Sequence, residues 1–136
     1  MLNLFTYGSL MSSDIMYHVA GCCADFVPAT LKDFQRSRIR GEEYPGIVPH
    51  PGAEVEGILY LHLSPKAIER LDSFEGDLYI RQDVQVMTQH GLCPAMSYVI
   101  KAEHSDLLTG EIWSYEHFLT VGKANFLEAY VGFRKI

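Results

Sequence analysis

The sequence predicts an α+β protein built on a mixed sheet of five to six strands with flanking helices. Apolar stretches with period-two alternation recur along the chain and are separated mostly by turns. Segments with helical spacing are fewer: two shorter ones and a longer apolar one near the end. Strands and helices do not alternate regularly, which argues against a doubly wound α/β sheet. We expect one domain over residues 1–136.

Composition narrows the class of protein. Apolar residues make up 48% and charged residues 21% of the chain, a balance typical of soluble globular proteins. The formal charge of −6 disfavours nonspecific binding to nucleic acid or to an anionic membrane. No run approaches the roughly 20 apolar residues of a membrane span. The first residues lack the pattern of a signal peptide, so we expect a cytoplasmic protein with neither nucleic acid nor membrane as partner.

Cysteine and histidine usage gives no metal or disulfide pattern. The three cysteines include an adjacent pair and no Cys-x-x-Cys, so we interpret them as buried or half-buried thiols. The six histidines are scattered without the spacing of metal ligands. We therefore expect no metal site.

The first elements are a strand and a helix joined by a turn. Residues 2–7 predict a strand that stops at Tyr-Gly-Ser, and residues 13–20 predict a helix with one apolar face. Ser12 or Ser13 is the expected N-cap, and Gly21 follows the helix as a C′ glycine would.

The next stretch is harder to assign. Residues 23–32 predict a strand in which Pro28 marks a bulge or an edge. Arg36, Arg38 and Arg40 then alternate, which places them on one face of a strand. They form either a solvated edge or a basic strip that helps to hold a substrate carboxylate. Three prolines and three glycines predict a loop or broken hairpin over residues 41–53.

The second half of the chain has clearer signals. Residues 54–63 are apolar on both faces, as in a central strand. Ser64 and Pro65 begin a helix that Glu75-Gly76 ends. Residues 79–88 and 94–101 predict a hairpin. A last helix over residues 113–133, bent near Gly122, is expected to pack through Phe118, Leu119, Phe126, Leu127 and Tyr130.

The turn formed by Tyr7, Gly8, Ser9 and Leu10 is one candidate binding element. A strand that passes through a glycine turn into a helix leaves backbone N–H groups unpaired, and these can hold an anion or a polarised carbonyl. Gly8 allows a conformation that a side chain would forbid and lets a ligand approach closely. The alternative is a simple strand-to-helix connection.

Glu75 is the candidate catalytic residue. It follows the apolar end of a helix, and a carboxylate at the rim of an apolar pocket has a raised pKa, which suits a proton shuttle near neutral pH. Alternatively, Glu75 is a solvated residue at a helix end. Asp72 would be its neighbour at i, i+3, either as a supporting group or at the surface.

These motifs together resemble a known family. The chain carries Tyr7-Gly8-Ser9-Leu10, then Tyr44-Pro45-Gly46-Ile47-Val48-Pro49, Val55-Glu56-Gly57-Ile58-Leu59-Tyr60 and finally Asp72-x-Phe74-Glu75-Gly76-x-x-Tyr79-x-Arg81. This order resembles the gamma-glutamylcyclotransferase-like family, which includes gamma-glutamylamine cyclotransferases and AIG2-like proteins. The resemblance covers most of the chain and implies a closed or nearly closed small barrel.

The resemblance also implies an activity. In such enzymes the glutamate matching Glu75 is the general acid/base, and the turn matching Tyr7 to Leu10 holds a gamma-glutamyl group. The substrate's own alpha-amine attacks its gamma-carbonyl, giving 5-oxoproline and a free amine without any cofactor. Tyr79 either lines the pocket, orients Glu75 or is a packed strand tyrosine, and Arg81 is expected to form a structural ion pair.

Other functions are compatible with the same motifs. A binding protein of this fold without turnover would keep the turn and pocket, whereas an interaction domain would have a filled pocket. Ser9 and Phe74 depart from the Thr and Tyr that many members carry at these positions, and these changes affect the leaving group more than the fold. Neither the leaving amine nor the oligomeric state follows from the sequence.

Overall fold

Five strands form a closed barrel in the order β1-β3-β2-β4-β5. The computed structural model describes residues 2–124. The strands are β1 (Leu2–Thr6), β2 (Phe26–Arg38), β3 (Pro45–Leu63), β4 (Tyr79–Thr88) and β5 (Gly91–Ile100). The β1–β5 pair is parallel and the other pairs are antiparallel, so the sheet is mixed, as the sequence predicts. The barrel that the family resemblance implies is confirmed as well.

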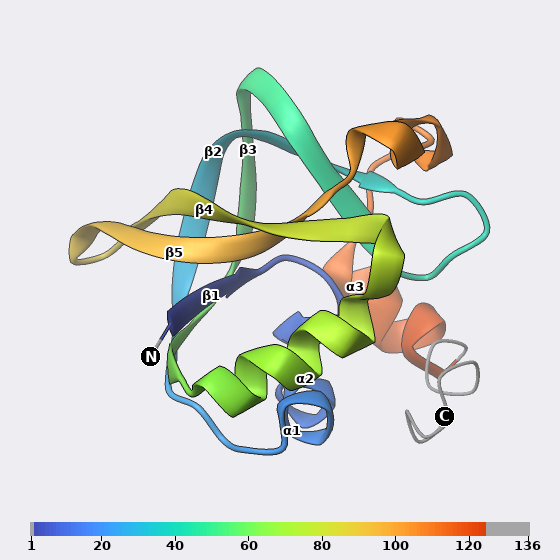
Figure 1. Ribbon diagram of the computed structural model, residues 1–136. Coiled ribbons are helices and arrows are strands. Elements are labelled where there is room, and N and C mark those ends of the chain that lie inside the picture. The colour runs from blue at the N-terminus through green and yellow to red at the C-terminus, as the bar shows by residue number, and fades with distance from the viewer. Residues whose placement is uncertain (1, 125–136) are drawn as a thin grey trace.

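Two helices cover one side of the barrel, where they pack against each other (Figure 1). They are α1 (Ser13–Ala20) and α2 (Pro65–Glu75), with the ends that the capping residues predict. Gly21 has the left-handed φ of 80°, and the Ser64 hydroxyl accepts a hydrogen bond from the Ala67 N–H at 3.1 Å. Gly76 ends α2, again with a positive φ, of 72°. Local signals therefore determine where both helices begin and end.

Strand β1 lies between two hydrophobic clusters because its side chains alternate. Leu4 belongs to the cluster that packs the barrel against α1 and α2. Phe5 belongs to the second cluster, together with Leu31, Val55 and Leu59 from neighbouring strands. The chain leaving β1 is thus held on both faces before it enters the turn at Gly8.

Of the loop or broken hairpin predicted over residues 41–53, the loop is confirmed only up to residue 44, because β3 begins at Pro45 and runs for 19 residues. Strands β2 and β3 form an antiparallel hairpin whose register shifts between Lys32 and Phe34, so the structure supports the hairpin alternative. Within residues 2–124, the first half of β3 pairs only with β2, while β1 pairs with residues 58–63. A strand with one free edge tolerates prolines, since their missing N–H groups leave no ladder hydrogen bond unmade. Residues 34–38, which were hard to assign from the sequence, belong to β2 and pair with the first half of β3.

A β-bulge at Asp33 changes which side chains of β2 point the same way. The register with β3 shifts between Lys32 and Phe34, and Asp33 has a φ of 66°. Its carboxylate accepts a hydrogen bond from the Gly52 N–H at 3.0 Å. Between the pairs Lys32–Glu54 and Phe34–Pro49, Asp33 stands opposite residues 50–53 of β3. Beyond it Phe34 packs in the same hydrophobic cluster as Leu31, so Phe34 and Arg36 continue the side of the strand on which Leu31 lies. Without the bulge, period two would place Gln35 and Ser37 there.

The final helix is only partly described. Residues Tyr115–His117 form α3, and Phe118–Gly122 continue as a π-helical turn. Phe118 is buried as expected, but Leu119 is 45% exposed, so its predicted packing is wrong. Phe126, Leu127 and Tyr130 lie outside the described residues. Within residues 2–124, the helices are too short or too polar to traverse a lipid bilayer.

Candidate active site

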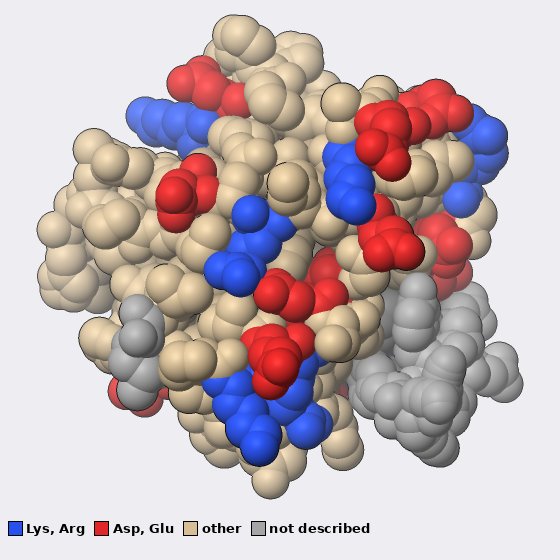
Figure 2. Space-filling view, viewed as in Figure 1, with Lys and Arg blue, Asp and Glu red and all other residues tan. Residues whose placement is uncertain are grey.

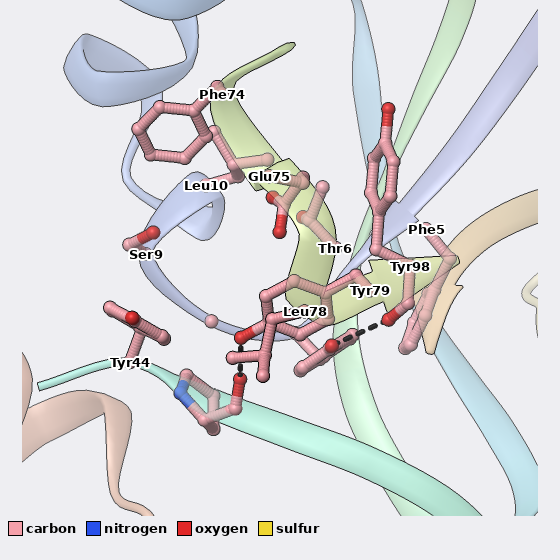
Figure 3. Close-up of a pocket in the computed structure, with 13 residues that line it drawn as sticks. Phe5, Thr6, Ser9, Leu10, Tyr44, Phe74, Glu75, Leu78, Tyr79 and Tyr98 are labelled. Carbon is pink, nitrogen blue, oxygen red and sulfur yellow. Dashed lines mark hydrogen bonds between the residues drawn. The ribbon is translucent and has the colours of Figure 1, made fainter. Parts of the chain in front are cut away.

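A cavity opens where β1 and α2 both end. It has an empty volume of about 570 Å³, including its mouth. All six residues that the sequence and the family resemblance single out line it: Tyr7, Gly8, Ser9, Leu10, Glu75 and Tyr79. Figure 3 shows the carboxylate of Glu75 pointing into the space between the turn and Tyr79. The fold therefore joins two motifs that are more than 60 residues apart in the sequence.

The turn leaves three backbone donors available to this cavity. Strand pairing of β1 ends at Thr6, and Ser9–Met11 form a 3₁₀ turn. The Met11 N–H donates to the Gly8 carbonyl at 2.9 Å. Among residues 2–124, no oxygen accepts a hydrogen bond from the N–H groups of Gly8, Ser9 or Leu10. These N–H groups match the unpaired donors expected at a strand-to-helix turn.

Gly8 is also required by the packing of β3 against the turn. Its φ is −135°, which is not the left-handed conformation that only glycine adopts readily. A Cβ at this position would lie 2.7 Å from Cδ of Pro45, the first residue of β3. Glycine therefore allows β3 to pack directly against the turn.

Glu75 has the electrostatic environment of a proton shuttle. Removal from water raises the pKa of its carboxyl to about 8, and the negative charge of Asp72 contributes to the same shift. No hydrogen bond from the part of the chain that is described reaches this carboxyl group. Protonated and ionised forms are therefore both populated near neutral pH.

Asp72, one helical turn earlier, has the opposite shift. Burial alone would raise its pKa, but hydrogen bonds from Arg81 and Tyr98 outweigh that effect and lower it. Arg81 binds both carboxylate oxygens, at 2.9 and 3.2 Å, and the Tyr98 hydroxyl donates at 2.6 Å. Two carboxyl groups on one helix are thus driven towards different protonation states. The structural ion pair expected for Arg81 is present.

Charges of both signs are interspersed on the surface of the protein. On the face shown in Figure 2, Lys and Arg side chains lie next to Asp and Glu side chains instead of forming a broad basic area.

Two tyrosines connect the cavity wall to the barrel. The Tyr7 hydroxyl donates to the carbonyl of Tyr98 at 2.6 Å, and burial together with the charge of Glu75 raises the Tyr7 pKa. The Tyr79 hydroxyl donates to the carbonyl of Pro45 at 2.7 Å. Of the alternatives for Tyr79, the structure therefore supports a residue that lines the cavity and fixes β3, and its hydroxyl is directed at Pro45 and not at Glu75.

The three alternating arginines do not form a strip along the cavity. Arg36 donates to the Tyr7 carbonyl at 2.8 Å, beneath the turn. Arg38 is exposed and lies 3.9 Å from Glu111, and Arg40 follows the end of β2 and donates to the Asp106 carbonyl. The bulge makes Arg36 continue the buried side of the strand, and the end of β2 separates Arg40 from the other two.

Further cavity residues were missed from the sequence. They are Phe5, Thr6, Tyr44, Pro45, Phe74, Leu78 and Tyr98. Tyr44 and Pro45 were missed as site residues because their stretch was interpreted as a loop. Tyr98 pairs with Arg81 in the β4–β5 hairpin, whose two-residue turn lies at residues 89–90 between the paired Thr88 and Gly91. A turn one residue longer, over residues 89–91, would have placed Val99 opposite Arg81. No cluster of three potential metal ligands occurs within the described part of the chain.

The sequence of this chain is similar to known proteins of one family. A family model described as "Gamma-glutamyl cyclotransferase, AIG2-like" matches residues 4–115. AIG2-like protein C of Arabidopsis thaliana is 33% identical over 130 residues, which span 93% of this chain and 74% of that protein. AIG2-like protein A of the same plant is 30% identical over 132 residues, or 94% and 78%.

Solved structures share the fold. The solution structure of an Arabidopsis thaliana protein is 29% identical, with a TM-score of 0.73 over 98% of this chain and 91% of that one. A structure named gamma-glutamyl cyclotransferase has a TM-score of 0.66 over 94% and 86%, and its identity of 20% shows likeness of fold alone. The small mixed barrel is the fold that this chain shares with these structures. The chain belongs to the AIG2-like gamma-glutamyl cyclotransferase family.

Proposed function

We propose that this protein is an intramolecular cyclotransferase that converts a gamma-glutamyl amine, amino acid or acyl derivative to 5-oxoproline and the free amine. The observation that carries the proposal is the Glu75 carboxyl group, with a pKa of about 8, in one cavity with the three unpaired N–H groups of the turn. The family description and the cyclotransferase among the structural neighbours support the same reaction class.

Glu75 would carry the proton. In its ionised form it takes a proton from the substrate's alpha-ammonium, and the freed amine attacks the gamma-carbonyl carbon. A new C–N bond closes the five-membered ring, and the original C–N bond to the leaving group breaks. The proton held by Glu75 passes to the departing amine. The ring nitrogen, which is still NH2+ after the attack, loses its second proton through the same carboxylate to the released amine, which leaves as an ammonium ion, so the Glu75 carboxylate is regenerated.

The turn would stabilise the charge that develops on the gamma-carbonyl oxygen. The N–H groups of Gly8, Ser9 and Leu10 are fixed before substrate binds, because β1 and the 3₁₀ turn hold the backbone on either side. Donors that are already oriented require little reorganisation in the transition state. The nucleophile belongs to the substrate, so the reaction needs no protein nucleophile and no cofactor, and the main task of the cavity is to hold amine and carbonyl in contact.

The experiment is 5-oxoproline release from a panel of gamma-glutamyl amines, amino acids and peptides. Glu75→Gln removes the proton carrier while keeping the side-chain shape, and we expect its kcat to fall about 10²–10⁴-fold. Asp77→Asn is the matched control, since Asp77 is an exposed carboxylate two residues away that does not line the cavity. Circular dichroism shows whether both variants keep the fold.

Two results would contradict the proposal. If Glu75→Gln is as active as the wild type, the reaction does not use Glu75 as its acid/base. If the wild-type protein releases 5-oxoproline from no member of the panel, the cyclotransferase function fails. Binding of panel compounds without product would then identify a small-molecule binding protein of the same fold.

A further inference from the structure

Arg36 makes the hydrogen bond that holds the turn from outside the cavity. Its Nη1 atom lies 2.8 Å from the carbonyl oxygen of Tyr7 and 3.3 Å from that of Glu56. Its guanidinium carbon lies 5.2 Å from the centroid of the Trp113 ring, as in a cation–π contact. Arg36 does not line the cavity, so it can act on a substrate only through the turn.

The bond from Arg36 also determines the direction of the Gly8 N–H. The Tyr7 carbonyl and the Gly8 N–H belong to one peptide unit, which is planar and trans, so the two groups point in opposite directions. When Arg36 holds the carbonyl on its own side, the N–H is directed to the other side. Gly8 lines the cavity, and no described residue accepts from its N–H.

The peptide between Tyr7 and Gly8 needs such support. Pairing of β1 with β3 stops at Thr6, so no ladder hydrogen bond holds the Tyr7 carbonyl. Rotation of a peptide unit next to glycine meets little steric resistance. Within residues 2–124, Arg36 is the group that donates to the Tyr7 carbonyl.

Arg36 is itself held in place by buried groups. Trp113 is 4% exposed, and its Nε1 donates to the Glu43 carbonyl at 2.7 Å. That carbonyl lies just before Tyr44 and Pro45, which form one wall of the cavity. The Trp113 ring therefore connects the support of the turn to the neighbouring wall formed by Tyr44 and Pro45.

We propose that Arg36 is a positioning residue that orients the Gly8 N–H towards the substrate carbonyl by holding the Tyr7 carbonyl. The inference rests on the proposed function, because it assigns a task to one donor of that reaction. It predicts an effect on kcat more than on KM, since an oxyanion donor acts chiefly in the transition state.

The test compares Arg36→Met and Arg36→Gln, which remove the contact, with Arg36→Lys, which keeps a charged donor. We expect kcat for 5-oxoproline release to fall about 10²-fold or more in the Met and Gln variants, with KM changed less than about threefold. Arg36→Lys should recover part of the loss. Arg38→Met is the matched control, an exposed arginine two residues along β2 that has no contact with the turn.

A second measurement does not depend on turnover. In the amide NMR spectrum, the Gly8 signal should broaden or split in Arg36→Met and Arg36→Gln and remain single in Arg38→Met. A folded Met or Gln variant with wild-type kcat and an unchanged Gly8 signal would overturn the inference. If wild-type protein shows no turnover, the proposed function fails, and the Gly8 signal alone decides whether Arg36 holds the peptide. If Arg36→Met does not fold, the Gln variant gives the same comparison.

Discussion

Glu75 and Asp72 show how one helix provides two carboxyl groups with different properties. They lie three residues apart, yet burial raises the pKa of Glu75, while Arg81 and Tyr98 lower that of Asp72. The ionised Asp72 then increases the pKa of Glu75 through its charge. The proton affinity of Glu75 therefore depends, through Asp72, on Arg81 of β4 and Tyr98 of β5.

The pH dependence of the reaction should report this coupling. In the proposed reaction Glu75 must be ionised to accept a proton, so kcat/KM should rise with pH up to about 8 and then level off. Asp72→Asn removes the nearby negative charge and frees the positive charge of Arg81, and both changes lower the Glu75 pKa. The rising limb should therefore move to lower pH in a profile of kcat/KM. Asp77→Asn should leave the limb in place, and a limb that stays or moves upward in Asp72→Asn would contradict the coupling.

Glu75 should also make the protein less stable at high pH. The folded protein keeps the Glu75 proton up to about pH 8, whereas the unfolded chain releases it near the ordinary value of 4.5. The unfolded state binds fewer protons between these values, so this contribution to the free energy of unfolding declines as pH rises through that range. Glu75→Gln removes the titration.

Urea unfolding at two pH values tests this sign. At pH about 9, Glu75→Gln should be more stable than the wild type by roughly 1–4 kcal/mol, allowing for partial solvent screening, and near pH 5 the difference should largely vanish. Glu69→Gln changes an exposed carboxylate of the same helix and is the control. Greater stability of the wild type at the higher pH would show that the folded protein favours the ionised form.

At the scale of single elements, the bulge in β2 has the largest consequence for the site. Asp33 adopts a φ of 66° and accepts the Gly52 N–H, and beyond this irregularity Arg36 lies on the side of β2 that faces the turn. Alternation alone places Arg36 and Arg38 on one face of a strand, but it cannot say which face, because an irregularity in the pairing exchanges the two faces. Nor does alternation reveal that Arg40 lies beyond the end of β2.

The bulge can be tested by substitution at Asp33. Asparagine also tolerates the left-handed region and keeps a side-chain oxygen that can accept from the Gly52 N–H. The stability of Asp33→Asn should therefore be close to that of the wild type. Asp33→Val introduces a β-branched side chain at a positive φ and removes the acceptor. We expect a loss of about 1–3 kcal/mol in the free energy of unfolding, measured by urea denaturation. Equal stability of the two variants would show that the left-handed conformation contributes little.

At the scale of the whole molecule, closure of the barrel depends on a close approach of β1 and β3. A Cβ on Gly57 would lie 2.1 Å from the carbonyl oxygen of Thr6 and 2.8 Å from the Phe5 ring. Neither group can move freely, since Phe5 is buried in the barrel and the Thr6 hydroxyl donates to Ile58 at 2.9 Å. Glycine at position 57 thus sets the distance between the strand that leads to the turn and its neighbour.

Gly57→Ala should therefore destabilise the protein strongly. Overpacking at a rigid position costs about 1–3 kcal/mol or more, so the Tm should fall by about 5 °C or more. Gly41→Asn is the control, because Gly41 has a φ of 78° that Asn tolerates and no atom within 4 Å of an added Cβ. A Tm for Gly57→Ala equal to that of the control would mean that β1 and β3 can separate without cost.

The sequence by itself determined the elements whose signals are local. Period-two alternation gave β4 and its hairpin partner β5, and Ser64, Pro65 and Gly76 gave the ends of α2. The resemblance of the turn and the Glu75 segment to one family predicted the barrel and six residues that line one cavity. Each of these signals lies within a short stretch of chain, where backbone sterics and side-chain spacing act directly.

Only the tertiary structure decided the features that depend on distant segments. The prolines of β3 predicted a loop because nothing near them in sequence reveals that this half of the strand has a single partner. Arg36 meets Tyr7 across 29 residues, and Tyr98 meets Asp72 across 26. The pKa of Glu75 depends on its removal from water, and that requires the cavity walls to be assembled. Desolvation and long-range hydrogen bonds arise only when the chain has folded, so no local pattern records them.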